Sequence, residues 1–274
     1  MEIIGRAAGT TEIGDKEMTN TSTAAQVGGM TGQKFLYEKP ELLTKEVHSS
    51  MGFSVMERPY EFVRNVRAVP LTMVEFGSAQ RTYPIIFSNM ENPVPLAVHG
   101  IIDDENLFVD EDGKWDEMSY VPMYLRCHPF AFASGDGDRM AVVVDTAAAT
   151  VSDNPQFPFF VDGEISEQAG ALMKACVQYE AERKRTQEFC DRVKELGLLA
   201  PLRATHTPEG ASEPEPLANY IAINAEKLND LPADVIFELH TKGFLSAMYL
   251  QLYSLENWRH LMARRVVKIR QTTG

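Results

Sequence analysis

The sequence is poor in cysteine and in basic residues. Its 274 residues include only Cys127, Cys176 and Cys190, and no two of these form a CxxC pair. An odd number at such spacings indicates neither a disulfide framework nor a zinc site. The 26 Lys and Arg residues face 39 Asp and Glu, which gives a formal net charge of −13. Nucleic acids and anionic lipids both bind basic surfaces, so this balance argues against either partner.

Long hydrophobic runs are also missing. No run of about 18 apolar residues occurs, so we expect no membrane span. The first residues, MEIIGRAAGTTEIGDKEM, are interrupted by acids and lack the apolar core of a signal peptide. Unpaired cysteines are typical of a reducing compartment. Together these features predict a cytoplasmic protein.

The common catalytic motifs are absent from the sequence as well. It contains no HExxH, no GxSxG, no GxGxxG after an apolar run, and no phosphate loop ending in GK[ST]. GGMTGQK at 28–34 resembles a phosphate loop but fails its spacing. We therefore expect no bound cofactor and no metal.

What the sequence does contain is a series of short, branched apolar runs from residue 68 onward. AVPLTMV, YPIIFS, PLAVHGII, NLFV and MAVVVD are separated by clusters of Gly, Pro, Asn and Asp. This pattern predicts strands joined by tight turns. Asp112-Gly113 is a strong hairpin signal, because glycine accepts a positive φ without steric cost. Pro122 and Pro129 cannot donate to a sheet, so the residues between them form an edge, a loop or a short helix.

Helical periodicity dominates the second half of the chain. Ser166 is a plausible N-cap for a long central helix that ends at Gly197. Pro232 opens a later helix, Gly243 ends it, and apolar residues recur at helical steps from Phe244 to Met262. We predict an α+β fold: a mainly antiparallel sheet packed by the long central helix and by C-terminal amphipathic helices. Residues 1–50 are predicted to be a flexible N-terminal arm, and residues 51–274 a single domain.

Aromatic residues concentrate in one run, WDEMSYVPMYLRCHPFAF, at 115–132. Large rings with a neighbouring arginine have the composition of a recognition surface. The same rings can equally be ordinary core residues. The candidate ligand- or partner-binding residues are Tyr83, Phe108, Trp115, Tyr120, Tyr124, Arg126 and Phe130.

A second hypothesis is a metal-dependent enzyme. His99, His128 and the acids Asp103, Asp104, Glu105, Asp110, Glu111 and Asp112 supply the residue types of a metal site. Their spacing matches no calcium loop, and solvation of a turn explains the acids equally well. Cys127 and His128 are neighbours, so in a strand they would face opposite sides of the sheet and make a poor thiolate–imidazolium pair.

Several segments together resemble the SapC family of bacterial proteins. They are PLTMVEFGSAQRTYPIIFS, ENLFVDEDGKW, YVPMYLRCHPFAFA, the helix end ELGLL and ELHTKGFLSAMYLQLYSLENWRHLMAR. The resemblance runs from about Val69 to Arg265. It implies an association with bacterial surface layers, by gene location, and an accessory role beside enzymes similar to flavin-dependent tryptophan halogenases. It supplies no catalytic residues.

These observations favour a non-enzymatic accessory protein. We expect it to bind a peptide, a protein or a small ligand through the aromatic segment. A protein or peptide is the expected partner, and the resemblance adds an enzyme similar to flavin-dependent tryptophan halogenases as a candidate. The alternatives are the metal-dependent enzyme and a structural component of a surface layer, which would require export and ordered self-assembly.

Overall fold

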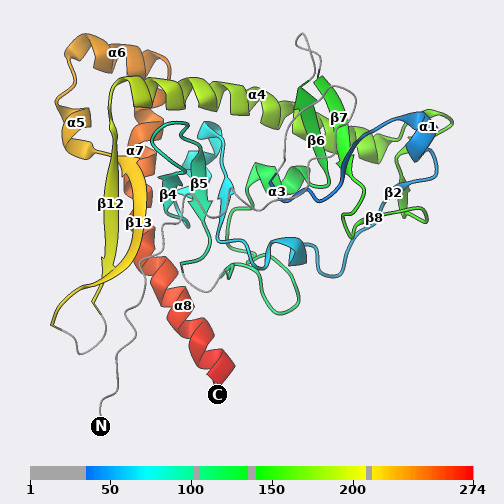
Figure 1. Cartoon of the computed structure of the whole chain (residues 1–274), viewed down its shortest axis with the longest axis horizontal. Helices are drawn as coiled ribbons and strands as arrows, with labels where there is room; N and C mark the ends of the chain where they lie inside the picture. The colour runs from blue at the N-terminus through cyan, green and yellow to red at the C-terminus, as the bar shows by residue number, and fades with distance from the viewer. Residues whose placement is uncertain (1–34, 102–104, 135–139, 208–211, 274) are drawn as a thin grey trace.

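The chain folds into an α+β structure, as predicted. The computed structural model describes residues 35–101, 105–134, 140–207 and 212–273 (Figure 1). All pairings between its strands are antiparallel. The Gly and Asp cluster at 135–138, which precedes the apolar run MAVVVD and predicts a turn, lies outside the described residues.

The larger sheet has five strands in the order β12-β13-β4-β5-β3. They are β3 (Ala68–Pro70), β4 (Ile85–Phe87), β5 (Pro95–Val98), β12 (Leu199–His206) and β13 (Glu215–Ile223). β12 and β13 form a long twisted ribbon at one end of the molecule (Figure 1). Only Ile221 of β13 pairs with β4, opposite Phe87, so this ribbon joins the short central strands at a single point.

The second sheet has three strands in the order β1-β7-β6. They are β1 (Pro40–Leu42), β6 (Phe130–Ser134) and β7 (Met140–Asp145). Five two-residue strands lie nearby: β2 (Gly52–Phe53), β8 (Val151–Ser152), β9 (Phe157–Pro158), β10 (Phe160–Val161) and β11 (Glu164–Ile165). β1 belongs to the predicted flexible arm, yet it pairs with β7, and Tyr37 just before it is buried. The folded part of the chain therefore begins before residue 50, while residues 1–34 lie outside the described ranges.

The described residues form eight α-helices. They are α1 (Lys45–His48), α2 (Phe76–Ala79), α3 (Met123–Cys127), α4 (Glu167–Glu195), α5 (Ala225–Asn229), α6 (Ala233–Thr241), α7 (Phe244–Ser254) and α8 (Asn257–Thr273). Two single 3₁₀ turns, η1 (Glu61–Val63) and η2 (Met73–Glu75), complete the described elements.

The predicted ends of the helices are confirmed. The Ser166 hydroxyl accepts a hydrogen bond from the Ala169 N–H at 3.2 Å and caps α4. Gly197 follows α4 with φ +63°, and Gly243 separates α6 from α7 with φ +75°. These positive angles suit glycine, because it carries no Cβ. The apolar stripe from residue 244 to 262 is divided between α7 and α8 by a break at Leu255 and Glu256.

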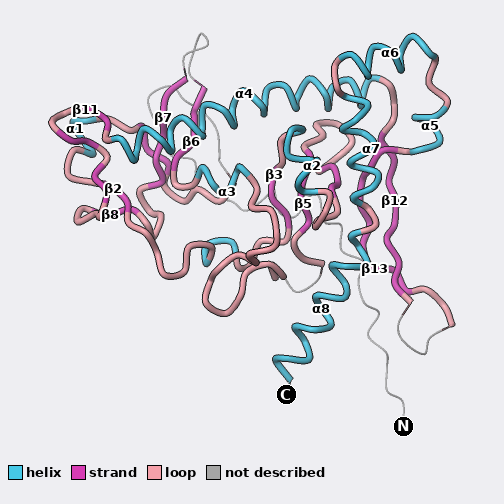
Figure 2. The backbone as a smooth tube through the Cα atoms, turned by 180° about the vertical axis from the view of Figure 1, so that it is seen from behind, coloured by secondary structure: helices cyan, strands magenta, loops and turns pink. Residues whose placement is uncertain are grey.

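The long helix α4 runs past both sheets (Figure 2), and two hydrophobic cores share it. Near the N-terminus of α4, Ala169 and Cys176 pack against Phe130 of β6 in the smaller of the two cores, which we name the second core. Near its C-terminus, Phe189 and Val193 pack in the first core, between the large sheet and α7. α4 therefore holds the two sheets together, and α8 leaves the body at the other side of the first core (Figure 1).

Candidate functional site

The seven candidate binding residues differ in exposure. Tyr83, Phe108, Trp115 and Phe130 are buried, Tyr120 and Tyr124 are half-buried, and Arg126 is exposed. A buried ring presents little area to a partner in this conformation. The seven side chains also do not share one surface, because they lie in three separate groups. Each group is described in turn below.

The first group surrounds His99. The ring centroids of Tyr83, Trp115 and Phe108 lie 4.7, 5.0 and 5.8 Å from the imidazole. Trp115 Nε1 donates to the Tyr83 hydroxyl at 3.3 Å, which in turn donates to the Tyr120 carbonyl at 2.5 Å. Neither ring nitrogen of His99 has a hydrogen-bond partner. Complete burial lowers the pKa of His99 to about 3, so the imidazole is neutral and belongs to the core.

The second group fixes the start of α3. The buried carboxylate of Glu75 accepts hydrogen bonds from the Tyr120 hydroxyl at 3.0 Å and from the Met123 N–H at 2.7 Å. Arg126 donates to the Tyr120 oxygen at 2.9 Å, and its guanidinium lies 5.5 Å from the Tyr120 ring centroid. Burial and the charge of Glu75 raise the pKa of Tyr120. Arg126 is the exposed residue of this group, whereas Tyr120 is half-buried.

The third group lies where the two cores meet, because Phe130 belongs to the second core and Tyr124 packs against the first. The Tyr37 hydroxyl donates to the Phe130 carbonyl at 2.6 Å, and the Tyr124 hydroxyl donates to the Phe35 carbonyl. The Tyr124 ring also packs edge-on against Tyr179 of α4 at 5.8 Å. Tyr124 and Phe130 therefore attach the segment before β1 to α3 and α4, which is a structural role.

Residues 105–119, which we name the acidic loop, carry the predicted turn. The turn is confirmed: Gly113 has φ +69°, and the Asp110 N–H donates to the Lys114 carbonyl at 2.9 Å. Val109 and Trp115 form an isolated antiparallel bridge across it. The strands expected on either side are absent from the described loop, so it is held by side chains instead.

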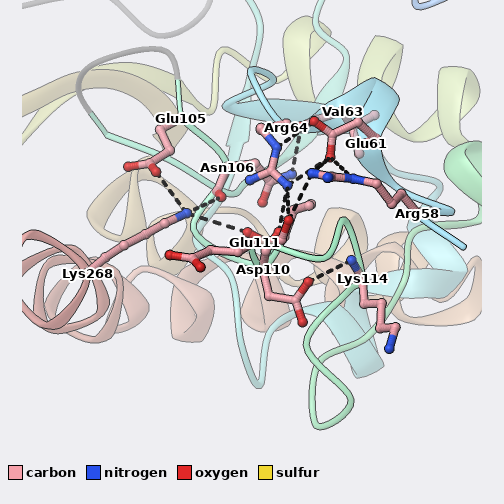
Figure 3. Close-up of polar contacts among 11 residues, drawn as sticks. Arg58, Glu61, Val63, Arg64, Glu105, Asn106, Asp110, Glu111, Lys114 and Lys268 are labelled. Carbon is pink, nitrogen blue, oxygen red and sulfur yellow. Dashed lines mark hydrogen bonds and ion pairs between the residues drawn. The ribbon is translucent and has the colours of Figure 1, made fainter. Parts of the chain in front are cut away.

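Two arginines hold the acidic loop on one side (Figure 3). Arg64 donates to the Asp110 carbonyl at 2.7 Å, and Arg58 donates to the Glu111 carbonyl at 2.8 Å. Glu61 binds both guanidinium groups, at 2.7 Å from Arg64 and 2.9 Å from Arg58. The hydrogen bond from Arg64 lowers the pKa of Glu61 to about 2. Arg58 and Arg64 thus bind the backbone oxygens of the loop, and the Asp110 and Glu111 carboxylates take no part in these hydrogen bonds.

Helix α8 holds the acidic loop on the other side. Lys268 lies 2.8 Å from the Glu105 carboxylate (Figure 3), and Arg264 lies 2.5 Å from that of Asp116. The Arg264 guanidinium also covers the Phe108 ring at 4.4 Å. Burial raises the pKa of Asp116, but the hydrogen bonds from Ser119 and Arg264 outweigh it and leave that pKa below its ordinary value.

A groove of about 1120 Å³ lies between the acidic loop and α8 and is partly open to solvent. Phe108 and Trp115, two of the predicted residues, contribute to its lining. Met118 stands on the loop wall with 90% of its surface exposed, and Val267 stands on the helix wall with 54% exposed. The polar residues that line the groove include Arg81, Lys114, His260 and Arg264. We name this feature the α8 groove.

The profile of the SapC family matches residues 43–261, about four fifths of the chain. The chain belongs to the SapC family. The matched range includes the whole acidic loop and the first turn of α8, so much of the groove lies within the SapC region. No curated protein and no solved structure matches the chain. Of the helices that the structure describes, none has both the length and the apolar content needed to cross a bilayer.

The two histidines of the metal hypothesis lie in different surroundings in this SapC protein. His99 is enclosed by the aromatic rings of the first core. His128 Nε2 lies 3.7 Å from Asp145, and its ring stacks on Phe62 at 4.3 Å. Across residues 35–101, 105–134, 140–207 and 212–273, no three His, Cys, Asp or Glu residues are grouped as metal ligands. Asp103 and Asp104 lie outside these ranges.

Cys127 and His128 are not in a strand, because Cys127 ends α3 and His128 follows it. Of the alternatives left open for the residues between Pro122 and Pro129, the short helix is the one that forms, so the argument from a strand does not apply. Their side chains still point to different partners. His128 contacts Asp145, while Cys127 packs against Cys176 in the second core.

Sequence reasoning missed Met118, Arg264 and Val267. The run Arg264–Arg270 has the pattern of a solvated helix face, whereas its first residues form one wall of the groove. The available signal was charge complementarity between this basic run and the acids at 105–117. That signal is weak in a chain with 39 acidic residues, because acids are found near any basic segment.

Proposed function

We propose that this SapC-family protein is a non-enzymatic accessory protein that binds a peptide segment of another protein in the α8 groove. The proposal rests chiefly on one observation: a large open groove bounded by the aromatic acidic loop and a basic helix. It keeps the aromatic segment as part of the site, through Trp115 and Phe108. In this proposal the partner contacts the exposed Met118 and Val267 side chains rather than the buried rings.

The chemistry of the two walls favours a peptide over a small apolar ligand. Met118 and Val267 offer apolar contact, and methionine adapts to irregular surfaces. Asp110, Glu111 and Lys114 add charges of both signs beside them. A segment with an apolar anchor residue flanked by charged residues would satisfy both kinds of contact.

The size of the groove points the same way. Pockets for small molecules usually measure roughly 300–1,000 Å³ and enclose most of the ligand. The α8 groove measures about 1120 Å³ and is partly open to solvent, so a small molecule would leave much of its surface in water. A peptide or an exposed helix of a partner would cover Met118 and Val267 together.

The partner suggested by the family resemblance is an enzyme similar to flavin-dependent tryptophan halogenases. Within this proposal such an enzyme, or another cytoplasmic protein, supplies the bound segment. The surface-layer hypothesis would instead require ordered self-assembly, which electron microscopy of the purified protein would reveal as a regular lattice.

The proposal is tested by placing a photo-crosslinking amino acid at Met118 in the source cell. A control places it at Val55, which is 74% exposed and does not line the groove. We expect the Met118 position to capture one abundant partner, joined through a defined segment in the crosslinked peptides. Capture at Val55 of the same segment, or no segment shared among the Met118 adducts, would contradict the proposal.

A further inference from the structure

Two of the three cysteines meet in the second core although 49 positions separate them. Cys127 is the last residue of α3, and Cys176 lies on the facing side of α4. The Cys176 thiol donates weak hydrogen bonds to two backbone carbonyls, with its Sγ 3.8 Å from the Cys127 oxygen and 3.6 Å from that of Phe130. Both side chains are buried and reduced.

A small cavity of about 20 Å³ opens beside these two thiols. Its lining includes the phenol-bearing residues Tyr37, Tyr124 and Tyr179. A cavity of roughly 10–15 Å³ on this scale is enough for one water molecule, provided that polar partners are present. The space beside the thiols is therefore matched to a polar molecule of one or two oxygen atoms, and it is too small for an organic substrate.

The surroundings of Cys127 favour its thiolate. The neighbouring Cys176 thiol and the charge of Arg126 lower the pKa of Cys127, whereas burial and the charge of Glu75 raise it. The net direction is downward, toward a more reactive sulfur. Cys190 provides the contrast within the same chain, since burial in the first core raises its pKa to about 12.

We propose that Cys127 and Cys176 form a peroxide-reactive dithiol, in which Cys127 is the nucleophile and Cys176 the resolving thiol. The inference rests on the paired thiols and the adjoining cavity, and it is independent of the α8 groove. The substrate class is a small hydroperoxide, with hydrogen peroxide as the simplest member. The oxidised product is an intramolecular disulfide that joins α3 to α4.

The reaction has two balanced steps. The Cys127 thiolate attacks one oxygen of the peroxide, so an S–O bond forms, the O–O bond breaks, and hydroxide leaves and is protonated to water. The Cys176 sulfur then attacks the Cys127 sulfenic acid, forming the S–S bond and releasing a second water, with the thiol proton of Cys176 going to the leaving oxygen. Two thiols are oxidised by two electrons, and one peroxide is reduced to two waters.

The test uses the purified full chain, reduced, freed of reductant, exposed to hydrogen peroxide and mapped by mass spectrometry without reduction. We expect a peptide pair linked through Cys127 and Cys176 to form on the order of tenfold faster than Cys190 is oxidised. Dithiothreitol should reverse the link. Absence of the linked peptide, or oxidation of Cys190 at the same rate, would overturn the proposal. This measurement needs no variant, so folding defects cannot obscure it.

Substitutions assign the two roles. In Cys176→Ser, oxidation should stop at a sulfenic acid on Cys127, which dimedone traps when the sample is denatured in its presence. In Cys127→Ser, no such adduct should form on Cys176. The matched control Cys190→Ser should give the same linked peptide as the wild type. A dimedone adduct on Cys176 in Cys127→Ser would refute the assignment of Cys127 as the nucleophile.

Discussion

At the scale of single residues, His99 shows how the aromatic segment is used. Trp115 Nε1 donates a hydrogen bond to the Tyr83 hydroxyl, whereas the two ring nitrogens of the neighbouring His99 have no hydrogen-bond partner. A buried polar group without a hydrogen bond costs roughly 1–3 kcal/mol. Edge-to-face ring contacts at 4.7 and 5.0 Å offset part of this cost. The rings of the acidic loop are therefore occupied in packing a core residue.

His99 also makes a specific contribution to the dependence of stability on pH. The pKa of His99 is about 3 in the folded chain and about 6.5 in the unfolded chain. Between these pH values only the unfolded chain binds a proton at His99, so the free energy of unfolding is highest above pH 6.5 and decreases as the pH falls toward 3. In His99→Leu this contribution disappears. When the pH is lowered from 7.5 to 4.5, we expect the free energy of unfolding of the wild type to fall by about 3 kcal/mol more than that of the variant.

Urea unfolding of both proteins at a series of pH values measures this difference. Other titrating groups are common to the two chains, so subtracting the curves isolates His99 from the carboxylates. Parallel curves for wild type and His99→Leu across this range would show that His99 is solvated or hydrogen-bonded in the folded protein.

At the scale of elements, α8 and the acidic loop hold each other in place. They lie about 150 positions apart in sequence, and the contacts between them include the pairs Arg264–Asp116 and Lys268–Glu105. Exposed ion pairs contribute only about 0–1 kcal/mol each. We therefore expect the part of the chain that bounds the groove to have low local stability.

Removal of Arg264 should loosen that wall without unfolding the protein. In Arg264→Ala, Asp116 and the Phe108 ring lose their cation, so we expect amide exchange in residues 105–119 to rise by up to about fivefold. Arg259→Ala is the matched control, because Arg259 lies on the same helix and pairs only with the exposed Glu256 among the described ion pairs. Equal exchange in the two variants would contradict a role for Arg264 in holding the loop.

At the scale of the whole molecule, two cores share one long helix, and charge is unevenly distributed. α8 contains five Lys and Arg residues and no acid, so the remaining residues together carry −18. The basic helix lies against an acidic body and leaves the groove between them. Partner binding in this groove would involve the acidic loop and α8, whereas thiol oxidation in the second core would involve α3 and α4.

Local signals predicted the elements well but not the site. Ser166, Gly113 and Gly197 act through their own backbone positions, so their roles can be read from a few neighbouring residues. Whether Trp115 lies in the core or on a surface depends on what packs against it, and aromatic composition is the same in both cases. The groove and the thiol pair arise from residues 49 to about 150 positions apart, which only the fold brings together.

The most direct test of the binding account is the affinity of the purified protein for the partner captured at Met118. Val267→Asp places a charge on the helix wall of the groove, while Val177→Asp makes the same change on α4 at nearly equal exposure, 54% against 52%. We predict that Val267→Asp weakens binding at least about tenfold and that Val177→Asp leaves Kd unchanged. Equal Kd values for wild type and Val267→Asp would contradict binding in the α8 groove.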